Sequence, residues 1–135
     1  MRDAEREEAF LSVFVISERR ERYRLILGNP KRRCTFLDRL NHNLDFIPSL
    51  ARQIPGGQHS AVGVVRLLNG CGVRNLDIVY VISDVELDAQ YFSMQDAVEQ
   101  VIQSDSGSIV CCKPGRLAYY RPEAPERGYI LEKSA

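Results

Sequence analysis

Three acidic residues that follow an apolar run are the clearest set of side chains in this sequence that could do chemistry together. Asp84, Glu86 and Asp88 occupy every second position just after the apolar run 78–82. Alternate residues of an extended backbone point to the same side, so the three carboxylates would project together. Oxygen ligands of this kind suit Mg²⁺ or Ca²⁺. The match to an EF-hand loop fails at its glycine and glutamate positions, so we predict no bound metal or cofactor and keep these acids as an alternative metal site.

The four cysteines and two histidines form no recognisable catalytic pattern. Cys112, which precedes Lys113 at an expected turn, is the best placed nucleophile. A reactive thiol needs a nearby base or a lowered pKa, and no motif places His42 or His59 beside it. The sequence also contains no phosphate-binding loop and no hydrolase motif. These observations favour a protein that is not an enzyme.

Charge is distributed unevenly in this chain, although its formal net charge is zero. Eight basic residues and two acids lie between Arg19 and Arg39, whereas seven acids and no lysine or arginine lie between Asn75 and Cys112. Surfaces of opposite charge steer protein association and set its specificity. Arginine forks also bind phosphates, so the basic segment could bind nucleic acid as well.

A second interaction signal lies in the segment 116–122, which is rich in tyrosine and arginine. Both residue types are enriched at protein interfaces. Neighbouring residues of a strand point to opposite faces, so one of Tyr119 and Tyr120 is expected in the core and the other at the surface. Tyr120 is the candidate for a contact with a partner.

The spacing of apolar residues predicts two or three helices in the first 45 residues. Ser17 is expected to cap a helix that stops at Gly28. Asn29 and Pro30 are expected to start the next helix, whose apolar stripe runs on to Leu44.

The rest of the chain alternates helical and strand patterns. Ser60 is expected to cap a helix, and the β-branched run 78–82 to form a central strand buried on both faces. Ser93 starts a second helix. A hairpin is expected over 108–120, and residues 128–131 could add an edge strand.

These elements predict one α+β domain over residues 1–135, which is the usual length of a single domain. Residues 1–56 form a helical segment and residues 57–135 an α-β-α-β-β segment. The β-α-β-β order of the C-terminal half predicts a small mixed sheet of three or four strands that packs with the helical N-terminal half.

The composition favours the cytoplasm. No stretch approaches the length of about 20 apolar residues that crosses a bilayer, and the first residues do not form a secretion signal. The scattered cysteines are expected to be reduced thiols.

The leading hypothesis is therefore a small cytosolic protein-interaction module that binds a protein partner through charged surfaces, as an inhibitor, an immunity-like protein or a self-associating dimer does. Nucleic-acid binding through the same arginines and a metal-dependent enzyme built on the three acids are the alternatives. Both leading hypotheses require that the basic and acidic segments do not neutralise each other within the fold. The residues expected at the partner contact are Arg20, Arg24, Arg32, Arg33 and Tyr120.

Overall fold

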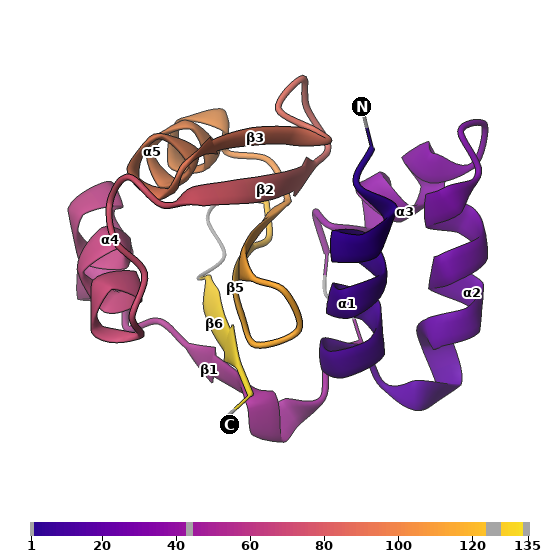
Figure 1. The fold of residues 1–135 in the computed structure, drawn as a ribbon, viewed down its shortest axis with the longest axis horizontal. Coiled ribbons are helices and arrows are strands. Elements are labelled where there is room, and N and C mark those ends of the chain that lie inside the picture. Colours follow the sequence, from indigo (N-terminus) through magenta and orange to yellow (C-terminus); the bar gives the residue numbers. More distant parts are fainter. Residues whose placement is uncertain (1, 43–44, 124–127, 134–135) are drawn as a thin grey trace.

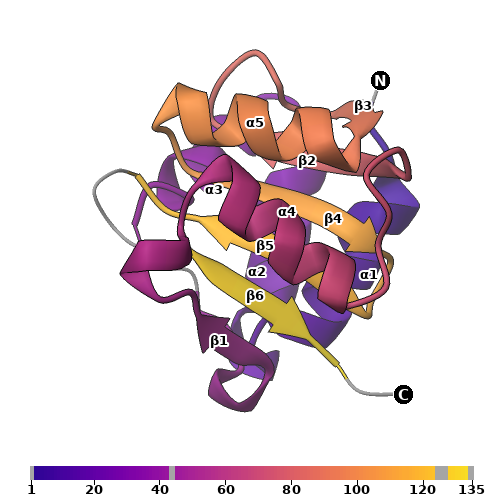
Figure 2. The same cartoon turned by 90° about the vertical axis from the view of Figure 1, so that its left-hand side faces the viewer.

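The computed structural model describes residues 2–42, 45–123 and 128–133, and its elements form three layers. A sheet lies between helices α1, α2 and α3 on one face and helices α4 and α5 on the other (Figures 1 and 2). The helices are α1 (Ala4–Phe14), α2 (Ser17–Gly28), α3 (Arg33–Arg39), α4 (Ala61–Gly70) and α5 (Met94–Ser104). The strands are β1 (Ala51–Gln53), β2 (Ile78–Ser83), β3 (Gln90–Ser93), β4 (Ser108–Lys113), β5 (Leu117–Arg121) and β6 (Tyr129–Glu132). The predicted α+β class, with a helical N-terminal half and a strand-rich C-terminal half, is confirmed.

The sheet is larger than expected and antiparallel throughout the described strands, with the order β1-β6-β5-β4-β2-β3. The expected three or four strands omitted β1 and β3. The expectation of a mixed sheet was wrong because β3 reverses the chain before α5, so β4 returns antiparallel to β2. The expected helical segment 1–56 likewise contains a strand, β1, at its end.

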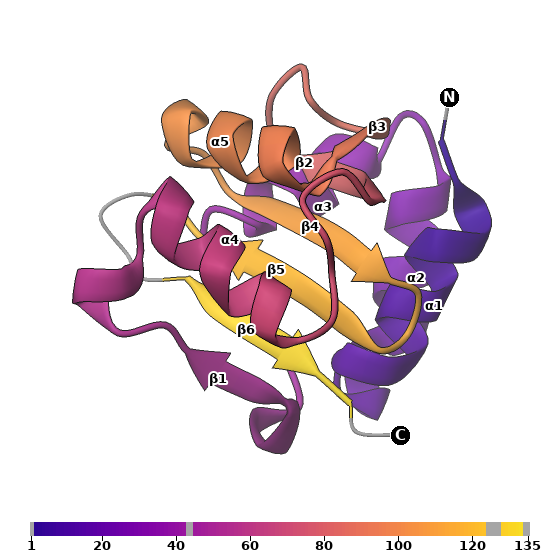
Figure 3. The same cartoon turned by 60° about the vertical axis from the view of Figure 1, so that its left-hand side comes forward.

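Helices on both faces bury the strands on both sides (Figure 3). In β2, the side chains of Tyr80 and Ile82 join the core beneath α1, α2 and α3, whereas those of Val79 and Val81 join the core beneath α4 and α5. The prediction of a strand buried on both faces is confirmed for β2, which lies one strand from the edge. An apolar run without alternation was the correct signal for a doubly covered strand.

Two of the predicted helix caps are confirmed. The side chain of Ser60 accepts a hydrogen bond from the Gly63 amide at the start of α4, and that of Ser93 accepts one from the Asp96 amide at the start of α5. Each cap satisfies an amide that has no partner within its helix. Ser17 does not cap α2, because the helix begins at Ser17 itself and Ile16 occupies the cap position. The Ser17 hydroxyl donates to the Glu18 carboxylate.

The third helix begins later than expected. Asn29 and Pro30 belong to a turn, in which the Asn29 side chain accepts a hydrogen bond from the Lys31 amide, and α3 starts at Arg33. The expected apolar stripe of this helix is buried at Phe36 and Leu40. Leu44, its last predicted member, lies outside the described residues.

The C-terminal hairpin is formed by β4 and β5, as predicted, and Gly115 in its turn has a φ of +67° that favours glycine. The strand expected at residues 128–131 is β6. It is not an edge strand, because it pairs with both β1 and β5. Among the described residues, none of the helices is long and apolar enough to span a membrane.

Candidate functional site

Arg33, one of the arginines predicted to contact a partner, is held inside the fold by two carboxylates. Its Nη2 lies 2.8 Å from Oε2 of Glu7 and its Nε lies 2.8 Å from Oδ2 of Asp88. The Arg33 side chain is 12% exposed and that of Glu7 only 1%. Burial lowers the pKa of Arg33, but hydrogen bonds to Asp88 and Glu7 outweigh this effect and raise it, so the guanidinium stays charged.

This ionic cluster, defined as Glu7, Arg33, Asp88 and Tyr80, joins α1, α3, β2 and the turn after β2. The Tyr80 hydroxyl donates to Glu7 Oε2 at 2.6 Å. The Ser83 amide donates to Asp88 Oδ1 at 3.1 Å. Such a fully hydrogen-bonded arrangement compensates the cost of burying charge. At this point the basic and acidic segments do face each other within the fold.

Two further arginines that were expected to bind a partner have internal contacts. Arg24 pairs with Glu8, its Nε lying 2.7 Å from Oε2, and Arg20 donates to the backbone carbonyl of Val15 at 2.8 Å. Arg19 and Arg39 both lie within 4 Å of the Asp45 carboxylate. Within the described part of the chain, the segment from Arg19 to Arg39 leaves four basic residues without an ion pair: Arg20, Arg22, Lys31 and Arg32.

Tyr120 does not reach the surface. Its side chain is 1% exposed, and its hydroxyl donates to the Leu40 carbonyl at 2.8 Å and also lies against the carbonyl of His42. Its ring packs against Phe46 with centroids 4.9 Å apart. The expectation that one of the two neighbouring tyrosines is exposed was wrong, because helices cover both faces of the sheet and Tyr119 is also buried.

The three acids after β2 are not brought together as a metal site. The strand ends at Ser83 and a turn follows, so the alternation that would align the carboxylates is lost. Asp88 is held by Arg33, and Asp84 accepts a hydrogen bond from the side chain of Asn41 at 2.6 Å. The Glu86 side chain lies at an exposed position of the turn. In the described ranges, no group of three His, Cys, Asp or Glu side chains could hold a metal ion.

A groove lies between α2 and α3 and has an exposed apolar side chain in its wall. Its volume is about 470 Å³, and Leu25, 65% exposed, stands in its wall. Glu18 and Glu21 lie in the N-terminal half of α2, and Arg32 lies where α3 begins. The groove is lined by Glu18, Glu21, Arg22, Leu25, Ile26, Arg32 and Thr35, and we call it the α2–α3 groove.

Of the residues predicted to contact a partner, only Arg32 lines this groove. Leu25 was missed because it belongs to no motif and carries no charge. The helical phase could have revealed it: Tyr23, Ile26 and Leu27 are buried on one side of α2, and Leu25 falls on the other. Glu18 and Glu21 share that outer side and carry no motif of their own.

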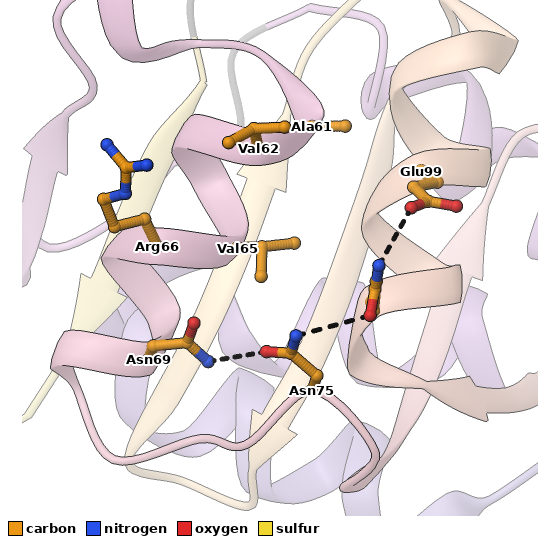
Figure 4. Close-up of a pocket in the computed structure, with 8 residues that line it drawn as sticks. Ala61, Val62, Val65, Arg66, Asn69, Asn75 and Glu99 are labelled. Atoms are coloured by element: carbon orange, nitrogen blue, oxygen red, sulfur yellow. Dashed lines mark hydrogen bonds between the residues drawn. The ribbon is translucent and has the colours of Figure 1, made fainter.

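A second groove lies between α4 and α5 and has a volume of about 290 Å³ (Figure 4). Val62 and Val65 stand on its α4 side. A chain of hydrogen bonds runs from Asn69 through Asn75 and Gln95 to Glu99, with donor–acceptor distances of 2.9 to 3.3 Å. Because these side chains bond one another, they connect α4, the loop before β2 and α5. No sequence motif marks this arrangement, since its members come from three separate segments.

The adjacent thiols of β4 are unsuited to nucleophilic chemistry. Cys111 faces one core and Cys112 the other. Burial raises the pKa of both thiols, to about 12 for Cys112. A thiol that remains protonated is a poor nucleophile.

The thiols are therefore expected to differ in reactivity. A disulfide reagent at neutral pH should label the exposed Cys34 rapidly in the native protein, and should label Cys111 and Cys112 only in denaturant. The release of chromophore with time measures this difference. Cys34→Ser should remove the fast phase, and a fast phase from Cys112 in the folded protein would contradict the structure.

The chain was also compared with known proteins. No protein family model, no curated protein and no solved structure matches it.

Proposed function

We propose that this chain is a small protein-interaction module that binds a protein partner through the α2–α3 groove. One observation carries the proposal. Leu25 is 65% exposed in a groove whose four charged residues form no ion pair with any described residue. These four residues are Glu18, Glu21, Arg22 and Arg32.

The character of the groove favours a protein over a nucleic acid. An apolar side chain with a charged rim is the usual anatomy of a protein interface, in which the apolar contact supplies affinity and the rim supplies specificity. Glu18 and Glu21 would repel phosphates, whereas both signs of charge can be matched by a protein surface. The internal ion pairs of Arg24 and Arg33 also reduce the positive charge that nucleic acid would need. The four free thiols support a cytoplasmic location for this module.

Site-specific cross-linking tests the proposal. A photoreactive amino acid is placed at Leu25 of the full chain and, as the matched control, at Leu76, which is 81% exposed and does not line the groove. We expect irradiation in native lysate to give a protein adduct from position 25 and none from position 76. The position-25 adduct should disappear when Arg32 is changed to glutamate.

Two results would overturn the proposal. An adduct that nuclease treatment removes would show that the groove binds nucleic acid. Equal adducts from both positions, or no adduct from either, would show that Leu25 has no specific partner.

A further inference from the structure

We infer that the partner of the α2–α3 groove is a second copy of this chain, bound in a two-fold symmetric dimer. The inference rests on the proposed function and names the partner of the same site. It is carried by the order of charges along the groove. When two copies of the groove face each other in opposite directions, the acidic end of each lies against the basic end of the other.

The groove has an end that carries Glu18 and Glu21 and also Arg22, an apolar middle at Leu25 and a basic end at Arg32. Glu18 is the second residue of α2, Leu25 follows two helical turns later, and Arg32 immediately precedes α3. Leu25 is seven residues from each of the other two. At a rise of about 1.5 Å per residue, Glu18 and Leu25 are about 10 Å apart along the helix.

A two-fold axis through Leu25 would place the acidic end of one groove against the basic end of the other. A symmetric interface uses the same patch on both copies, so if Glu18 of one copy contacts Arg32 of the other, the reciprocal contact forms as well. The Leu25 side chains would meet at the axis. If the two grooves were instead aligned in the same direction, acid would face acid and base would face base. This repulsion disfavours the parallel arrangement.

The position of α2 leaves room for a second copy. It is the outermost helix of its layer, at the right edge of Figure 1, on the side away from the sheet. Its buried residues Tyr23, Ile26 and Leu27 face inward, so the side that bears Leu25 has no covering element within the described chain. Exposed ion pairs are individually weak, so Leu25 supplies most of the affinity and the charges set the direction of pairing.

Sedimentation equilibrium over a wide range of protein concentration tests the dimer. The wild-type chain should change from 15.3 kDa to twice that mass as its concentration rises. Leu25→Asp should raise the dimer dissociation constant by about 100-fold, because each substitution acts twice at a symmetric contact. Leu76→Asp is the matched control and should leave the constant unchanged. Circular dichroism checks that both exposed-site variants fold.

Charge reversal tests the antiparallel pairing. One variant carries Glu18→Arg and Glu21→Arg, and another carries Arg22→Glu and Arg32→Glu. Each variant alone has a groove of one sign and should remain monomeric. An equimolar mixture should form a heterodimer about as stable as the wild-type dimer, and added salt should weaken it.

The outcomes separate this inference from the proposed function. A wild-type chain that stays monomeric, or a dimer unaffected by Leu25→Asp, overturns the second copy as partner. If the position-25 cross-linker then captures a different protein, the proposed function stands and only the partner was wrong. Absence of both dimer and adduct overturns the two together.

Discussion

Replacing Arg33 with alanine is expected to lower the free energy of unfolding by about 3 kcal/mol, because the buried carboxylate of Glu7 keeps only Arg2 as a charged partner and Asp88 loses its own. The Glu7 side chain is 1% exposed and would keep hydrogen bonds from Tyr80 and Arg2 only. Asp88 would lose its contact with α3 as well. Urea unfolding followed by circular dichroism measures the change.

The nearby Lys31 provides the matched control. It is exposed, does not line the α2–α3 groove and forms no ion pair with a described residue, so Lys31→Ala should change stability by less than about 0.5 kcal/mol. Combining Glu7→Gln with Arg33→Met should cost less than the sum of the two single changes, because the pair interacts directly. Equal effects of Arg33→Ala and Lys31→Ala would show that the ionic cluster does not form in solution.

Replacing Gly107 with alanine is expected to destabilise the fold by about 3 kcal/mol through overpacking. A Cβ at this position would lie 2.2 Å from the backbone carbon of Leu40 and 2.3 Å from its oxygen. The backbone cannot easily move away, because the Gly107 amide donates to the side chain of Asn41 at 2.7 Å. Thermal unfolding should show a melting temperature lower by about 10 °C.

Gly57 is the control for this substitution, because no atom lies within 4 Å of the Cβ that alanine would add there. Gly57→Ala should stay within about 0.5 kcal/mol of the wild-type chain. If Gly107→Ala were equally mild, the segment before β4 could not pack against the end of α3 as the structure shows.

The parts of the fold that were predicted correctly depend on local signals. The caps at Ser60 and Ser93 and the turn at Gly115 each follow from a few consecutive residues. Strands β1 and β3 were missed because they are only three and four residues long and depend on their neighbours in the sheet.

The environment of the candidate site residues could not be predicted for a different reason. Arg33 is 26 residues from Glu7 and 55 from Asp88, so its burial depends on how α1 and the turn after β2 meet α3. Tyr120 is covered for the same kind of reason, since the layer that contains Leu40 lies over its face of the sheet. Composition identified the charged segments, but tertiary packing decided which charges remained at the surface.

The place of β6 inside the sheet affects the order in which the chain can fold. Among the described strands, β1 pairs with β6 alone, and Ala51 and Leu131 are partners across 80 residues of sequence. Until β6 joins the sheet, β1 has no strand to pair with and β5 has an unpaired, apolar edge. Such an edge is a template for pairing with other chains. In a partly folded chain, β5 is therefore the strand that a chaperone would need to shield.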